Sequence, residues 1–131
     1  MGYDDCPPHP TWMEPVERLG GPGAKFPLHI DACHPKSRLH SQLGGTKLRE
    51  TYQVAGHEPC LINPKDVEAR GIKDGDVVRV LNERGQILAG AKVTDMVRAG
   101  VIRVNEGGWY DPAELRQAGN AVQVRRRSST C

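Results

Sequence analysis

A short stretch between positions 34 and 42 has the residue types that bind a polar organic ligand. The guanidinium of Arg38 offers a planar fork of donors that suits a phosphate or a flat carbonyl edge. Ser41 and Gln42 can each donate and accept hydrogen bonds, and the imidazoles of His34 and His40 do either, according to their tautomer. We interpret this stretch as a candidate ligand site. The alternative is a surface loop whose polarity is incidental.

The spacing of the same residues disfavours a metal site. His34 and His40 are six residues apart in a predicted loop, and the sequence places no third ligand close to them. No pair of cysteines has the C-x-x-C spacing of a zinc knuckle, so no metal ligand is predicted. We expect free thiols and, by default, a cytoplasmic protein, with a periplasmic parent enzyme as the alternative. The cysteines are Cys6, Cys33, Cys60 and Cys131.

Two other clusters could contact a flat ring. Gly107 and Gly108 permit a close backbone approach, and Trp109 directly after them could stack on a heterocycle or pack in the core. Asn120 carries an amide that could form hydrogen bonds with the edge of a base or a pterin, but the same residue also suits an ordinary turn. These positions extend the candidate ligand site beyond the first stretch.

Residues for catalysis by the chain itself are scarce. His57 and Glu58 are adjacent but have neither a serine nor a cysteine partner at a suitable spacing. The adjacent Cys33 and His34 do not have the geometry of a nucleophile and its base. The glycine patterns of a P-loop and of a dinucleotide-binding Rossmann fold are also absent. We therefore predict no catalytic residue.

The composition fits one compact β-rich domain with long connections. The chain has 131 residues, of which 37% are hydrophobic, 15 are glycine and 10 are proline. A net charge of +2 gives no indication of nucleic-acid binding. No apolar run approaches the roughly 20 residues that span a bilayer, so we expect no membrane contact. The polar start of the sequence does not have the pattern of a signal peptide.

The pattern of turns and apolar residues predicts the elements that position the candidate site. Prolines and glycines break residues 1–24 into an irregular arm or linker, and residues 34–46 read as a loop with one short helical turn at most. A short helix over 64–70 is expected to start at an Asn-Pro cap and to end at Gly71. Short strands separated by glycine-bearing turns favour a small barrel or sandwich. The predicted strands are 26–31, 59–62, 77–81, 87–94 and 101–104.

A series of linked motifs resembles the last domain of the DMSO/TMAO reductase family, which includes biotin sulfoxide reductase. The resemblance covers roughly residues 2–121. Its strength comes from many motifs in the same order and not from any single one. They include Phe26-Pro27-Leu28-His29, His34-Pro35-x-x-Arg38-Leu39-His40-Ser41-Gln42, Ile62-Asn63-Pro64-x-Asp66, Asp74-Gly75-Asp76, Asn82-Glu83-Arg84-Gly85 and Gly108-Trp109-Tyr110-Asp111.

The resemblance implies a mainly β fold over residues 25–122, a six-stranded double-psi β-barrel with one or two short helices. It implies a cofactor in which two molybdopterin guanine dinucleotides hold molybdenum. The family's metal-ligating side chain belongs to an earlier domain, so the resemblance assigns no catalytic or metal residue here. The implied cofactor contacts are His34, Arg38, His40, Ser41, Gln42, Trp109 and Asn120.

The end of the chain departs from the family pattern. Val122 stands where the family has a second asparagine, and residues 123–131 form a basic tail unlike the family's ending. We expect this tail to be disordered, although its arginine run could touch phosphates.

The main functional hypothesis is a domain that binds part of the molybdenum cofactor. It would be a fragment or split portion of an S-oxide or N-oxide reductase, inactive alone, and its partners would be the other domains of that enzyme, in cis or in trans. The alternatives are an orphan double-psi barrel that binds a protein or self-associates, and an independent enzyme.

Overall fold

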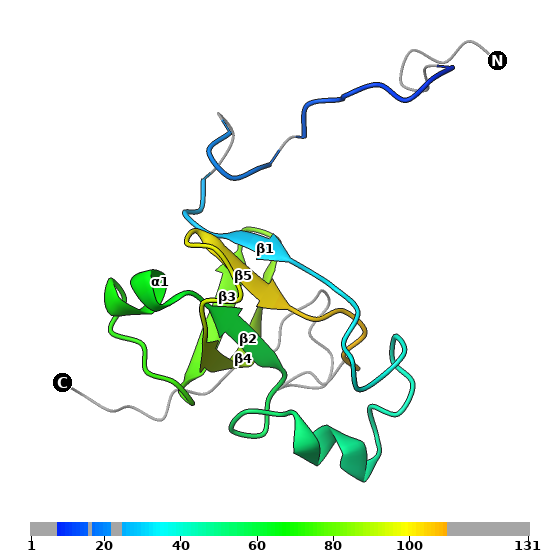
Figure 1. Ribbon diagram of the computed structural model, residues 1–131, viewed down its shortest axis with the longest axis vertical. Helices are drawn as coiled ribbons and strands as arrows, with labels where there is room; N and C mark the ends of the chain where they lie inside the picture. The colour runs from blue at the N-terminus through cyan, green and yellow to red at the C-terminus, as the bar shows by residue number, and fades with distance from the viewer. Residues whose placement is uncertain (1–7, 16, 22–24, 110–131) are drawn as a thin grey trace.

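The computed structural model describes residues 8–15, 17–21 and 25–109 of the chain (Figure 1). Asn120 and the basic tail over residues 123–131 lie outside this range. Within the described part, no helix is long and apolar enough to cross a membrane. The elements along the chain are β1 (His29–Asp31), the 3-10 helix η1 (Lys47–Thr51), β2 (Pro59–Ile62), α1 (Pro64–Glu68), β3 (Val77–Asn82), β4 (Gly85–Val93) and β5 (Val101–Val104).

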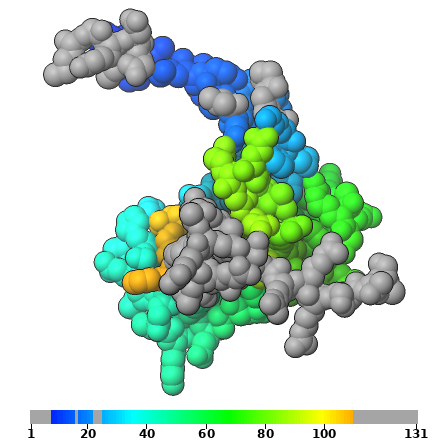
Figure 2. Space-filling model, turned by 180° about the vertical axis from the view of Figure 1, so that it is seen from behind, coloured from blue at the N-terminus to red at the C-terminus, as the bar shows by residue number. Residues whose placement is uncertain are grey.

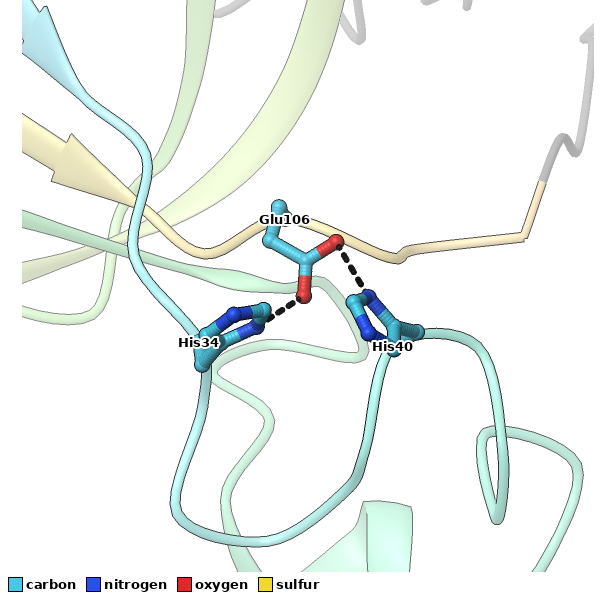
Figure 3. Close-up of side chains that lie close together, drawn as sticks. All are labelled: His34, His40 and Glu106. Atoms are coloured by element: carbon cyan, nitrogen blue, oxygen red, sulfur yellow. Dashed lines mark hydrogen bonds and ion pairs between the residues drawn. The ribbon is translucent and has the colours of Figure 1, made fainter.

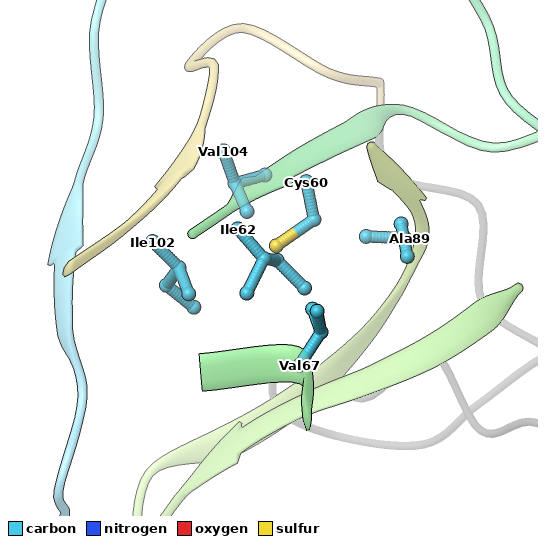
Figure 4. Close-up of a cluster of buried hydrophobic side chains, with 7 residues drawn as sticks. Cys60, Ile62, Val67, Ala89, Ile102 and Val104 are labelled. Carbon is cyan, nitrogen blue, oxygen red and sulfur yellow. The ribbon is translucent and has the colours of Figure 1, made fainter. Parts of the chain in front are cut away.

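The strands form one sheet in the order β1-β5-β2-β4-β3. Two pairings are parallel, β1 with β5 and β2 with β4. The other two, β2 with β5 and β3 with β4, are antiparallel. The sheet curls around its buried side chains and forms half of a barrel (Figure 4). The prediction of a mainly β fold with little helix is therefore confirmed.

The core inside the curled sheet is small and aliphatic. Partly buried side chains from β3 and β4, such as Val80 and Ile87, pack around it. In Figure 4, side chains from β2, β4, β5 and α1 point toward one another across the interior. Burial of this apolar area is the main favourable contribution to folding. The core residues are Cys60, Ile62, Val67, Ala89, Ala91, Ile102 and Val104.

Helix α1 starts where the sequence predicts. The side-chain oxygen of Asn63 accepts a hydrogen bond from the backbone N–H of Lys65 at 3.1 Å, and Pro64 occupies the first helical position. Val67 is the one buried residue of the helix and joins the core. The cap thus fixes the helix where its single apolar contact meets the sheet.

The same helix ends earlier than predicted, at Glu68 and not at Arg70. The N–H groups of Arg70 and Ile72 both donate to the carbonyl of Val67, at 3.0 and 3.1 Å, so the chain closes in a tight turn. Gly71 has a φ of 62°, the left-handed conformation expected of a helix stop.

The β3–β4 hairpin forms where two strands and a turn are predicted. The side chain of Asn82 accepts hydrogen bonds from the N–H groups of Arg84 at 2.8 Å and Gly85 at 3.2 Å, which holds the turn. Strand β4 runs over Gly85–Val93 where 87–94 was predicted, and Ala89 and Ala91 are fully buried in it. The predicted alternation is not seen in its burial, because Gly90 between them is buried as well, against Val54.

Strand β1 is shorter than the predicted 26–31. Its pairing with β5 begins at His29, which lies opposite Val101. In this parallel register, residues 26–28 extend past the first residue of β5, so they have no strand partner in the described part of the chain. Pro27 in addition has no N–H to donate to a neighbouring strand. The apolar pattern of the sequence therefore begins before the segment that pairs with β5.

The described part of the N-terminal segment extends away from the sheet as an arm (Figure 1 and Figure 2), and ion pairs join it to the β3–β4 turn. Arg84 donates two hydrogen bonds to Glu17, at 2.7 and 2.9 Å, and Lys25 pairs with Glu83 at 2.8 Å.

A largely apolar cavity of about 510 Å³ opens inside the half-barrel, and residues of both edge strands, β1 and β3, line it.

The thiol of Cys60 lies in the centre of the core and is fully buried. Burial raises its pKa to about 11. Because the thiolate is the form that reacts, we expect Cys60 to stay unmodified by iodoacetamide in the native chain at pH 8 and to react after addition of urea. Cys33, which is half-buried, serves as the internal comparison. Peptide mapping by mass spectrometry measures both, and rapid native labelling of Cys60 would show that this core opens.

Candidate functional site

The polar stretch predicted as a ligand site forms a series of turns between β1 and η1. Backbone hydrogen bonds from Gln42 to Leu39 at 2.9 Å and from Thr46 to Leu43 at 3.0 Å shape it. It folds against the segment that follows β5, residues 105–109, although the two are far apart in sequence. Figure 2 shows this segment in orange beside the cyan of the loop.

The side chain of Arg38 holds these two segments together. It is 1% exposed and forms an ion pair with Glu58 at 3.1 Å. Its Nε donates to the carbonyl of His40 at 3.0 Å, its Nη2 to the carbonyl of Glu106 at 2.7 Å, and its Nη1 also to the hydroxyl of Tyr52 at 3.2 Å. Burial acts to lower the pKa of Arg38, but the hydrogen bonds and charge of Glu58 outweigh it and raise the pKa. The guanidinium is therefore charged and engaged within the chain.

Both predicted histidines meet one carboxylate. Nδ1 of His34 lies 2.7 Å from one oxygen of Glu106, and Nδ1 of His40 lies 3.4 Å from the other. The two imidazole rings are nearly perpendicular, with centroids 4.9 Å apart (Figure 3). Hydrogen bonds from His34 and then His40 lower the pKa of Glu106 below its ordinary value. The carboxylate is thus charged at neutral pH.

The backbone here is tightly constrained. Gly107 has a φ of 80°, and a Cβ at this position would overlap the backbone of His40. His40 itself has a φ of 49°, a left-handed backbone conformation that residues other than glycine adopt only rarely. Strain of this kind persists only where the surroundings impose it, and it is common at functional sites.

Trp109 closes the other side of the loop. Its Nε1 donates to the carbonyl of Ser41 at 2.7 Å, while its side chain remains largely exposed. Gly44 lies against the indole, since a Cβ there would approach Trp109 Cδ1 to 3.0 Å. Gln42 is exposed beside them. The hydrogen bond at the edge of the indole therefore fixes the ring, and its exposed face is available for stacking.

A small cavity of about 40 Å³ lies beneath Trp109. Within the described residues, Nε of Arg49 is the one buried side-chain nitrogen or oxygen without a hydrogen-bond partner. A buried unpaired donor is costly, and it calls for a ligand or water to satisfy it. Arg49 is one of the residues that line this cavity. The lining residues are Arg38, Gly44, Arg49, Glu58, Gly107, Gly108 and Trp109.

The structure brings most of the predicted site residues into one place. His34, His40, Ser41, Gln42 and Trp109 are exposed on it. Arg38 is buried beneath it, and Asn120 lies outside the described residues.

The fold brings a further polar residue to the two histidines that the spacing of the sequence did not show. A third potential metal ligand, Glu106, lies beside both histidines. It is 66 residues from His40, so local spacing could not reveal it.

Sequence reasoning also missed Arg49 and assigned no role to Tyr52 and Glu58 in this site. Glu58 was considered only as a partner of His57. Glu106 had one visible signal, its place directly before Gly107-Gly108. Arg49 had none, because the absence of a partner for its Nε is a property of the folded chain.

Comparison with known proteins fits this arrangement. Residues 28–131 match the family model described as Molydopterin dinucleotide binding domain. The match covers most of the chain, which therefore belongs to this family of molybdopterin-dinucleotide-binding domains. The predicted resemblance to the DMSO/TMAO reductase family is confirmed.

The relatives show which larger proteins contain this domain. The chain is 71% identical over 119 residues, or 91% of its length, to the dimethyl sulfoxide/trimethylamine N-oxide reductase of Cereibacter sphaeroides. It is 59% identical over 115 residues, or 86% of its length, to trimethylamine-N-oxide reductase 1 of Escherichia coli (strain K12). The chain spans 14% of the length of each of these relatives.

A solved structure supports the fold alone. Acetylene hydratase from Pelobacter acetylenicus matches with a TM-score of 0.63 at 22% sequence identity. The match covers 76% of this chain and 14% of that chain.

Proposed function

We propose that the exposed side chains of His34, His40, Ser41, Gln42 and Trp109, here called the cofactor face, bind molybdopterin guanine dinucleotide. The observation that carries the proposal is this group of exposed aromatic and polar side chains beside a small cavity that Arg49 lines, whose buried Nε has no hydrogen-bond partner among the described residues. A cationic donor that lacks a partner suits a phosphate or a carbonyl of a ligand. The residues present therefore fit a polar, anionic dinucleotide.

Each group on the cofactor face would have a distinct role. The indole of Trp109 offers a stacking surface for a heterocycle, because its N–H is already bonded to Ser41. The imidazoles and the amide of Gln42 supply hydrogen bonds to polar edges. Arg38 would position this face through the carbonyls of His40 and Glu106, and Asn120 stays a proposed contact.

The chain would contribute binding and orientation to a larger enzyme. The bound group, molybdenum held by two such dinucleotides, supplies oxygen-atom transfer from S-oxides or N-oxides, the substrate classes that the relatives' names indicate. The other domains of such an enzyme would be the partners, in cis or in trans. Leu39 and Leu43 beside the cofactor face are 58% and 55% exposed, which fits a surface covered by another domain.

The finer fold proposal is a six-stranded double-psi barrel over residues 25–122, with residues 1–24 as an arm and residues 123–131 as a tail. The cavity inside the half-barrel supports it, because residues of both edge strands, β1 and β3, line that cavity. A sixth strand between these edges would close the barrel and pair both of them. Amide hydrogen exchange tests this: protection of N–H groups on both edges is expected.

Titration of the full chain with GDP, monitored by NMR, tests cofactor binding. Trp109→Ala is expected to weaken binding about tenfold, the loss typical when one base loses its stacking partner. Trp12→Ala is the matched control, because Trp12 is equally exposed but lies in the N-terminal segment. Absence of saturable binding by the unmodified chain, or equal effects of the two substitutions, would contradict the proposal.

Self-association is a second candidate, favoured by the same exposed leucines. Light scattering over a concentration series distinguishes it, because a self-associating chain gains mass with concentration while a cofactor-binding domain stays monomeric. A constant monomer mass would exclude self-association over that range.

A further inference from the structure

We propose that Glu106 is a positioning residue whose carboxylate fixes the imidazoles of His34 and His40 in one tautomer, so that both rings present a hydrogen-bond acceptor to the ligand. The ligand groups that match are N–H donors on the edge of a ring, which guanine and pterin both carry. The inference rests on the cofactor face proposed above and names the part of the dinucleotide that these two side chains select.

The positions of the ring protons follow from which atoms can donate. Nδ1 of His34 lies 2.7 Å from one oxygen of Glu106, and Nδ1 of His40 lies 3.4 Å from the other (Figure 3). An ionised carboxylate can only accept hydrogen bonds, and the lowered pKa of Glu106 keeps it ionised. Both Nδ1 atoms therefore carry the proton, and in a neutral ring this leaves Nε2 as an acceptor.

The Nε2 atoms of the two rings are available to a ligand. The side chains of His34 and His40 are 67% and 63% exposed, and neither Nε2 has a hydrogen-bond partner among the residues that the structure describes. With the ring centroids 4.9 Å apart, the two acceptors suit neighbouring N–H and amino donors on one ring edge. They do not suit a phosphate, whose oxygens are acceptors as well. The pair therefore selects a ring of the dinucleotide and not its phosphates.

The backbone holds Glu106 between the two imidazoles before any ligand binds. The N–H of Glu106 donates to the carbonyl of Cys33 at 3.0 Å, which places Glu106 beside His34. Arg38 donates to the carbonyls of His40 and Glu106 at 3.0 and 2.7 Å. These contacts keep His40 at a φ of 49°, and strain of this kind persists only where the surroundings impose it. The fold, and not the ligand, thus sets the two tautomers.

Nitrogen NMR of the histidine rings in the full chain tests the role of Glu106, because protonated and unprotonated ring nitrogens differ in chemical shift. At pH 8, where an ordinary imidazole is neutral, His34 and His40 are expected to carry the proton on Nδ1. In Glu106→Ala both rings should move toward the form with the proton on Nε2, which a free histidine side chain favours. In Glu106→Gln only His40 should change, because the amide has one acceptor oxygen and the shorter contact assigns it to His34.

Two controls accompany these spectra. Glu83→Gln is the matched control, because Glu83 is an exposed acid that pairs with Lys25 away from both rings, and it should change neither tautomer. His57 is the internal standard: its Nδ1 lies 2.6 Å from the carbonyl oxygen of Ala55, so it should keep its proton on Nδ1 in every variant. Backbone NMR spectra verify that the variants are folded. A proton on Nε2 of either ring beside Glu106 in the unmodified chain, or unchanged rings in Glu106→Ala, overturns the proposal.

Titration of the full chain with neopterin, GDP and inorganic diphosphate tests the ligand assignment. Glu106→Ala is expected to weaken binding of at least one of the two ring probes about tenfold, the loss of one or two hydrogen bonds, and to leave binding of diphosphate unchanged. The probe that loses more shows whether pterin or guanine lies on the imidazoles. Unchanged binding of both ring probes, or an equal loss for diphosphate, overturns the assignment. If the unmodified chain binds no probe, the proposed function fails together with the assignment, whereas the ring spectra decide the role of Glu106 by themselves.

Discussion

Arg38→Met is expected to lower the free energy of unfolding by about 3 kcal/mol, the range found when one partner of a buried ion pair is removed. The guanidinium side chain is 1% exposed and its partner Glu58 is 19% exposed. Methionine fills much of the same space but leaves the carboxylate of Glu58 without its cation. It also leaves the carbonyls of His40 and Glu106 without the donors they have now. Urea denaturation measures the change.

Two further variants identify the cause of that loss. Arg103→Met removes an arginine of the same length that pairs with Asp31, but its side chain is 34% exposed, so the expected change is about 1 kcal/mol or less. Adding Glu58→Gln to Arg38→Met should recover part of the stability, because it removes the unpaired charge. Equal losses in Arg38→Met and Arg103→Met, or no recovery in the double variant, would show that Arg38 does not act as a buried charge.

The elements that could be predicted from the sequence are those formed by local patterns. An apolar run between turns predicted β3, alternating apolar residues predicted a strand that overlaps most of β4, and the Asn63-Pro64 pair predicted the start of α1. Each depends on contacts within a few residues, so spacing carries the information. The predicted strand over 26–31 was too long because its start depends on where β5 begins, about 70 residues later.

The candidate site could be located from the sequence but its internal order could not. Composition marked the loop over 34–42, and the resemblance gave it a ligand. The network that shapes it joins Arg38 to Glu58 and Glu106, which are 20 and 68 residues away. From the sequence alone, an arginine in a polar loop fits a ligand contact and a structural anchor equally well. Only the folded chain distinguishes a donor already in use, on Arg38, from one still unpaired, on Arg49.

Gly107→Ala is expected to destabilise the chain by about 3 kcal/mol and to disturb the contacts of Glu106 with His34 and His40. Two effects add at this position. The φ of 80° is unfavourable for alanine, and the new Cβ would overlap the backbone of His40. Relief of the overlap requires the segment after β5 to move away from the loop. That movement would separate Glu106 from both imidazoles.

Gly75→Ala separates the two effects. Gly75 has a φ of 87°, but a Cβ there would meet nothing within 4 Å, so only the backbone strain of about 1–2 kcal/mol remains. Urea denaturation of both variants should give a larger loss for Gly107→Ala. Histidine-ring NMR should show altered His34 and His40 signals in that variant alone. If both substitutions cost the same and the ring signals are unchanged, the loop and the segment after β5 are not in the close contact on which the cofactor face depends.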